Sequence, residues 1–127
     1  MLTKNIKPTE SELEILQVLW DRGEATVREV HEELVEIKDC GYTTTLKLMQ
    51  IMFEKGLVDR DSSNKTHIYT AAVSREKTQE QFVNKMINSL FAGSSTELVM
   101  HALGGHNTSN AELEKIQQLI NELKAKK

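Results

Sequence analysis

The chain has 127 residues, of which 39% are hydrophobic, 28% charged and 5% aromatic, and its formal net charge is −3. This length suits one domain, or one small domain with an accessory element. The single cysteine, Cys40, excludes an internal disulfide and favours a reducing compartment. Residues 1–8 lack the apolar core of a signal peptide, and no apolar run approaches the length of a membrane span. We therefore expect a cytoplasmic protein.

Charge is unevenly distributed along the chain. Residues 1–41 carry five basic residues against ten acidic ones, a net of −5, whereas residues 42–73 and residues 74–127 each carry a net of +1. The composition therefore points to no polyanionic partner by itself, and any basic surface must be local.

Two helices with clear boundary signals are predicted at the start of the chain. TESE at residues 9–12 is a capping box, apolar residues follow it at helical spacing, and residues 21–23 end this helix. Thr26 can cap the second helix, and residues 38–41 break it. The apolar stripe expected on the second helix is Val27, Val30, Leu34 and Ile37.

A third helix followed by a β-hairpin is predicted next. The third helix covers YTTTLKLMQIMFEKG at residues 42–56 and ends at its glycine. Two short strands at residues 57–60 and 67–70 flank a polar turn. Ser74, Ser94 and Ser109 then start three further helices. We predict a mainly α fold with a small β-hairpin: a winged helix-turn-helix domain over residues 1–73 and a C-terminal helical dimerisation domain over residues 74–127.

The third helix presents a polar face that suits DNA. On a helical wheel its core side holds Thr45, Leu46, Leu48, Met49, Met52 and Phe53, and its other side holds Thr43, Thr44, Lys47, Gln50, Ile51 and Glu54. Hydroxyls and amides near a helix N-terminus bind phosphate oxygens, while Lys and Gln reach base edges. The ordinary alternative for such a face is plain solvation.

The order of the predicted elements favours DNA binding over plain solvation. Three helices followed by a hairpin are the layout of a winged helix, in which the third helix enters the major groove and the hairpin lies along the backbone. Basic residues near the hairpin tip can supply one or two phosphate contacts. The DNA-binding residues we predict are Thr43, Thr44, Lys47, Gln50, Arg60, Lys65 and His67.

The three C-terminal helices have strong apolar stripes but are too short to form a full core alone. They either fold back on the first domain as a monomer or pair with a second copy, and a symmetric dimer is the economical solution. Two copies also double the DNA contacts of a weakly basic domain. The dimerisation residues we predict are Phe82, Met86, Leu90, Leu98, Val99, Leu103, Leu113, Ile116, Ile120 and Leu123.

Catalytic and metal signals are absent from the sequence. The four histidines and Cys40 lack metal-ligand spacing, no base neighbours the threonine run, and no phosphate loop occurs. We therefore expect no enzymatic activity, no cofactor and no metal.

Two segments of the chain resemble a known family. TESELEILQVLWDRGEATVREVHEEL and YTTTLKLMQIMFEKGLVDRDSSNKTHIY are similar to the winged-helix repressors of the penicillinase-repressor and methicillin-resistance-repressor family, to which a copper-responsive repressor also belongs. The resemblance extends to the C-terminal helices. It implies a homodimeric transcriptional repressor that binds a palindromic, double-stranded DNA operator, with the C-terminal helices forming the dimer.

The resemblance also implies a way to relieve repression. Family members of the β-lactam branch are inactivated when a membrane sensor protease triggers cleavage in a helix similar to LVMHAL, which places the corresponding bond at His101 and Ala102. That branch has Asn-Phe at this bond, so the present residues differ. The copper branch carries paired C-terminal cysteines, and the ending NELKAKK has none, which excludes the copper mechanism.

A different class of function stays open from the residues alone. The acidic first 41 residues and the modest charge of the third helix also suit a winged helix used as a protein-protein adaptor that does not bind DNA.

Overall fold

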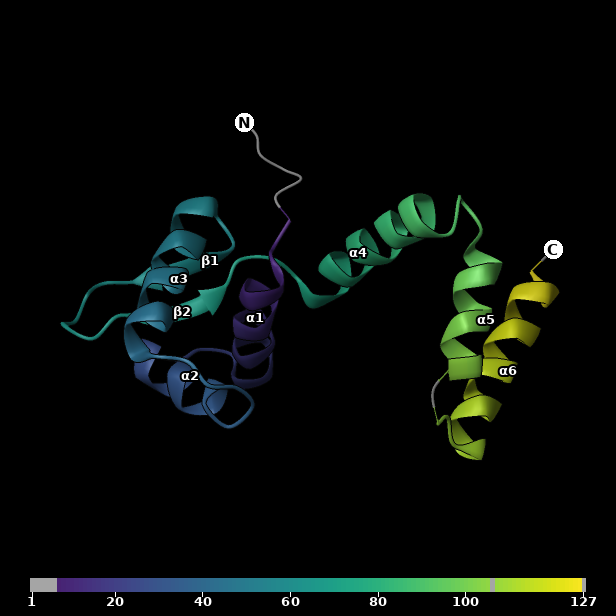
Figure 1. Cartoon of the computed structure of the whole chain (residues 1–127), viewed down its shortest axis with the longest axis horizontal. Helices are drawn as coiled ribbons and strands as arrows, with labels where there is room; N and C mark the ends of the chain where they lie inside the picture. The colour runs from purple at the N-terminus through teal and green to yellow at the C-terminus, as the bar shows by residue number, and fades with distance from the viewer. Residues whose placement is uncertain (1–6, 106, 127) are drawn as a thin grey trace. The chain divides into compact units, whose positions relative to one another are not determined.

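The computed structural model describes residues 7–105 and 107–126. In these residues a two-stranded antiparallel hairpin follows three helices and precedes three more, which confirms the predicted fold class (Figure 1). The elements are α1 (Glu10–Arg22), α2 (Val27–Leu34), α3 (Tyr42–Lys55), β1 (Val58–Asp61), β2 (Ile68–Ala71), α4 (Arg75–Leu90), α5 (Ser95–Gly105) and α6 (Asn110–Ala125).

Helix α1 begins and ends as its sequence predicts. The Glu12 N–H donates to Thr9 Oγ1 at 3.2 Å and the Thr9 N–H donates to Glu12 Oε1 at 2.9 Å, which is the reciprocal pattern of a capping box. Gly23 ends the helix with φ of 89°, a left-handed backbone that favours glycine. Helix α2 starts with a second capping box, formed by Thr26 and Glu29.

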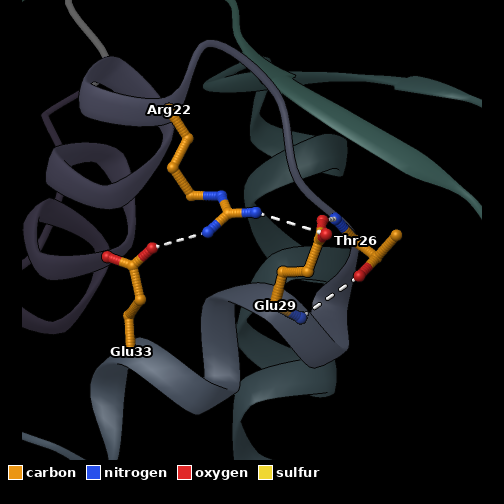
Figure 2. Close-up of polar contacts among 4 residues, drawn as sticks. All are labelled: Arg22, Thr26, Glu29 and Glu33. Atoms are coloured by element: carbon orange, nitrogen blue, oxygen red, sulfur yellow. Dashed lines mark hydrogen bonds and ion pairs between the residues drawn. The ribbon is translucent and has the colours of Figure 1, made fainter.

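Arg22 joins the end of α1 to the first turns of α2 (Figure 2). Its Nη2 lies 3.2 Å from Glu29 Oε2, and its Nη1 lies 2.9 Å from Glu33 Oε2. The hydrogen bond from the Thr26 backbone N–H lowers the pKa of Glu29, and the Arg22 cation adds to this effect. Glu33 in turn raises the pKa of Arg22. The turn between the two helices is therefore fixed by a network of charged hydrogen bonds.

The hydrophobic core lies between the first three helices and the hairpin. Its buried members come from each of these elements and their connections: Ile15, Leu16, Val18, Leu19, Ala25, Val27, Val30, Leu34, Met49, Met52, Leu57, Val58 and Tyr69. An ion pair lies beside this core. The buried Glu12 carboxylate accepts two hydrogen bonds from Lys55 Nζ, at 2.7 and 3.0 Å. It ties α1 to the last turn of α3.

The hairpin has an inner and an outer face. Arg60 pairs with Tyr69 and Val58 with Ala71, so these four side chains share the face toward the helices, where Tyr69 is buried. Asp59 and Asp61 alternate to the opposite face. Both strands lie one residue later in the chain than predicted.

Two other expectations about single residues are wrong. Ile37 is 68% exposed, because α2 ends at Leu34 and its stripe stops there. Phe53 is 37% exposed instead of belonging to the core, and its ring packs against the guanidinium of Arg60, which lies 4.1 Å from the ring centroid.

The chain divides into two compact units between Gln81 and Phe82, so the first turns of α4 belong to the first unit. Trp20 Nε1 donates to the Val73 carbonyl at 2.9 Å, and Arg75 pairs with Asp21 while lying 5.5 Å from the Trp20 ring centroid. Thr78 is buried. These contacts dock the start of α4 on α1.

The second unit differs from the first in how far its side chains are buried. From Phe82 to Lys126, none of the described side chains is buried. A turn with positive φ at Ala92 and Gly93 separates α4 from α5, and the Phe91 and His101 rings lie 5.5 Å apart. None of the described helices has the length and apolar character needed to cross a bilayer.

Candidate nucleic-acid interface

Helix α3 separates its predicted core side from its polar side. Thr45 is buried, whereas Thr43, Thr44, Lys47 and Gln50 are exposed. The start of the helix is also available to a ligand, because its N-cap is Gly41, which supplies no side chain to bind the amides of the first turn. Such amides attract anions. The exposed face therefore combines hydroxyls, a cation and a carboxamide with an uncapped helix N-terminus.

Thr45 has a structural role that separates it from its two neighbours. Its Oγ1 lies 3.0 Å from Nδ1 of His31, a residue of α2. The threonine run therefore divides into one residue that binds α3 to α2 and two that face outward.

The hairpin presents one cation toward α3. The Arg60 guanidinium stacks on Phe53, and its Nε is buried without a hydrogen-bond partner among the described residues. Since Asp59 and Asp61 lie on the other face of the hairpin, the wing keeps its carboxylates away from α3. Asp61 also accepts a hydrogen bond from the Ser63 N–H at 3.0 Å, which lowers its pKa and shapes the turn.

A cleft of about 590 Å³ lies between the wing and the N-terminal ends of α2 and α3. Every charged side chain that lines it is basic, in a chain where acidic residues outnumber Lys and Arg by 19 to 16. The polar and charged side chains of its lining are Thr26, Arg28, Tyr42, Gln50, Arg60, Lys65, Thr66, His67 and Tyr69. Such a cleft suits an anion.

The structure brings together four of the seven residues predicted to bind DNA. Gln50, Arg60, Lys65 and His67 line the cleft. Thr43 and Lys47 do not line it, although both are exposed on α3. Thr44 instead borders a smaller pocket beside Cys40.

Five polar residues of the cleft lining were not predicted as site residues: Thr26, Arg28, Tyr42, Thr66 and Tyr69. Of these, Arg28 adds a charge and Tyr42 an exposed phenol. Arg28 stands in the first turn of α2, in the acidic part of the chain, and Tyr42 is the first residue of α3. A helical wheel of α3 alone places neither beside the wing. The one available signal was their position, since each lies in the first turn of a helix of the predicted helix-turn-helix.

The residues predicted to form the dimer are all partly or fully exposed in the single chain. Leu90 is the most exposed of the predicted set, at 70%, and the others lie on α4, α5 and α6. His101 and Ala102 are exposed within α5.

Among the described residues, no three His, Cys, Asp or Glu side chains gather as a metal site would require. His106, one of the four histidines weighed as a ligand, lies outside the described residues.

Comparison with known proteins identifies the family. The family model described as penicillinase repressor matches residues 8–122. The methicillin resistance regulatory protein MecI of Staphylococcus aureus strain N315 is 24% identical over 121 residues, which cover 95% of this chain and 98% of that protein. The penicillinase repressor of Staphylococcus aureus is 18% identical over 126 residues, covering 99% of this chain and all of that protein.

A further relative matches a shorter segment more closely. The transcriptional regulator BlaI of Mycobacterium tuberculosis is 34% identical over 64 residues, covering 50% of this chain and 46% of that protein. The family model spans both compact units. The resemblance of the two sequence segments is thereby confirmed, and the chain belongs to the penicillinase repressor family.

Proposed function

We propose that this protein is a dimeric, sequence-specific transcriptional repressor that binds a palindromic DNA operator. The observation that carries the proposal is the position of α3. It exposes Thr43, Thr44, Lys47 and Gln50 on one side while its other side is fixed in the core, and the cleft beside it carries only basic charge. The names of the relatives, which include repressors and regulators, support the same function.

In this proposal α3 enters the major groove with its N-terminal end leading. Lys47 donates to base-edge acceptors, Gln50 can pair with an adenine, and the hydroxyls of Thr43 and Thr44 bind phosphate or base oxygens. The wing contributes Lys65 and His67 to the DNA backbone, and the stack on Phe53 holds the Arg60 cation at its base.

The proposed operator is palindromic because a second copy of the chain supplies a second α3 helix, related to the first by twofold symmetry. The second unit buries none of its described side chains, yet it carries apolar residues on α4, α5 and α6 that water solvates poorly. Pairing with a second copy covers them and presents two α3 helices to half-sites spaced about 34–36 Å apart, or a multiple of this.

Relief of repression by cleavage between His101 and Ala102, triggered by a membrane sensor protease, is the regulatory part of the proposal. Both residues are exposed, but the bond lies inside α5, so a protease must first unwind this helix. Because no described side chain of this unit is buried in the single chain, we expect α5 to unwind at lowest cost in a chain that is not covered by its second copy.

The decisive experiment selects operator DNA from a random pool and then titrates it with variants at fixed salt. Lys47→Ala is expected to weaken the selected operator by about 1–3 kcal/mol and to relax the preferred base at one position. Lys65→Ala should weaken all sequences alike and flatten the salt dependence. Glu54→Gln, on the same helix but about 10 Å further along its axis than Lys47, is the matched control and should leave base preference unchanged.

One outcome overturns the proposal, and a second overturns only the role assigned to Lys47. Wild-type protein that enriches no sequence at low salt, together with a stable protein partner in a pull-down, would instead identify a protein-protein adaptor. Operator binding that Lys47→Ala leaves unchanged would remove this residue from base recognition.

A further inference from the structure

Tyr42 lines the basic cleft and is held in place by contacts with α2. It is the first residue of α3, and two α2 side chains contact its half-exposed ring. The His31 ring meets it edge-to-face at 5.5 Å, and the Arg28 guanidinium lies 5.9 Å from its centroid. His31 and Arg28 are three residues apart and therefore share one face of α2.

His31 is itself anchored on the far side. Its Nδ1 lies 3.0 Å from the Oγ1 of the buried Thr45, so its ring is tied to the packed side of α3. A ring fixed in this way limits the positions that Tyr42 can adopt. The phenol therefore loses little freedom when it binds a ligand.

Across the cleft from this pair stands the wing. Arg28 and Tyr42 line the cleft from the two helices, and Lys65, Thr66 and His67 line it from the hairpin. No carboxylate belongs to the lining as the structure describes it. Hydroxyl and guanidinium donors facing an ammonium group across an open cleft match a chain of phosphodiesters better than a single small anion, because donors stand on both walls.

We propose that Arg28 and Tyr42 form a second phosphate-binding wall, so that the backbone of one DNA strand is clamped between them and Lys65 of the wing. His31 acts as the positioning residue for Tyr42. This inference rests on the proposed DNA-binding function and adds to it Arg28 of α2 and Tyr42 at the start of α3.

The two wall residues are separable by their salt dependence. Tyr42→Phe keeps the ring and removes only the hydroxyl, so the selected operator should bind about fivefold more weakly with an unchanged salt slope. Arg28→Ala removes a cation, so the slope of log K against log salt should fall by about 0.9 for each bound protomer. Lys77→Ala, an exposed lysine outside the cleft, is the matched control and should change neither quantity.

A double-mutant cycle tests the positioning role of His31. His31→Ala should weaken operator binding several-fold in the wild-type background and add little on top of Tyr42→Phe, while a thermal melt checks that the variant is folded. Equal losses in both backgrounds would show that His31 acts only on stability or on Thr45.

Ethylation interference tests the clamp itself. Phosphates whose ethylation weakens wild-type binding should lose that effect in Arg28→Ala and in Lys65→Ala, and the two sets should lie on the same strand within a few nucleotides. Sets on opposite strands would overturn the clamp. So would wild-type affinity and slope in both Tyr42→Phe and Arg28→Ala, whereas wild-type protein that binds no DNA would overturn the proposed function as well.

Discussion

The two compact units of this chain use apolar residues in opposite ways. Among its described residues, the first unit, which ends at Gln81, buries thirteen hydrophobic side chains around α1, α2, α3 and the hairpin. In the second unit, the described residues include several equally apolar side chains, such as Leu90 and Leu123, and none is buried. Apolar content alone therefore does not indicate a self-sufficient fold. In the first unit, helices and a hairpin that are distant in sequence enclose the apolar side chains from several sides, whereas the described elements of the second unit enclose none of theirs.

The contrast between the two units predicts that truncating a core side chain of the first unit lowers the free energy of unfolding more than any other change considered below. Leu16 is fully buried, so Leu16→Ala should destabilise this unit by about 2–5 kcal/mol through lost transfer energy and a cavity. The single tryptophan, Trp20, lies in the same unit, so its fluorescence during urea unfolding reports the change. Ile37→Ala, at a site 68% exposed in the same unit, is the control and should change the free energy of unfolding by no more than about 0.5 kcal/mol.

A charge on the apolar face of the second unit should act on association. Leu123→Glu is expected to weaken the dimer by about 1.5–3 kcal/mol, because it removes an apolar side chain from the proposed interface and adds a charge. Sedimentation equilibrium measures the change. Gln118→Glu adds the same charge on the polar side of α6 and should leave the dimer intact; a wild-type monomer at all concentrations would contradict the proposed interface.

The first unit also depends on one buried charge that the second lacks among its described residues. Lys55→Met leaves the buried Glu12 carboxylate without its two ammonium hydrogen bonds, and should cost about 1–3 kcal/mol. Urea unfolding followed by Trp20 fluorescence measures the loss. The double variant Glu12→Gln with Lys55→Met should recover part of it, because a neutral amide is less costly to bury; no recovery would mean that packing of the lysine stem dominates.

The smallest expected effect is a pH dependence at the turn between α1 and α2. Hydrogen bonding to Thr26 and the nearby Arg22 lower the pKa of Glu29, so its stabilising contribution is complete above its ordinary pKa of about 4.5 and is lost as pH falls through the lower folded value. Melting temperatures of wild type and Glu29→Ala should therefore differ at neutral pH and converge in acid. A difference that stays constant down to the acid range would show that the carboxylate charge is unimportant.

Local signals in the sequence predicted the element boundaries that local chemistry controls. The caps at Thr9, Thr26 and Ser109 and the left-handed Gly56 at the end of α3 are all present. Each depends on residues at most a few positions apart, which a single sequence displays directly.

Features that depend on tertiary contacts were harder to predict from the sequence. Phe53 fits the core side of a helical wheel, but its partner is Arg60 on a neighbouring strand, which periodicity does not reveal. Arg28 and Tyr42 enter the cleft because two helix N-termini and the wing converge in space. The contact of Arg75 with Asp21 and the burial of Thr78 similarly include the start of α4 in the first compact unit, which extends to Gln81.

The composition of α3 has one more consequence. Its first turn holds three threonines behind a glycine that offers no capping side chain, so its helical form depends on contacts such as Thr45 with His31 and Lys55 with Glu12. A synthetic peptide with the sequence of α3 should therefore be largely unstructured in water. Such a peptide should compete poorly with the intact protein for DNA. Gentle heating that loosens α1 from α3 should abolish the proposed DNA binding in one cooperative step.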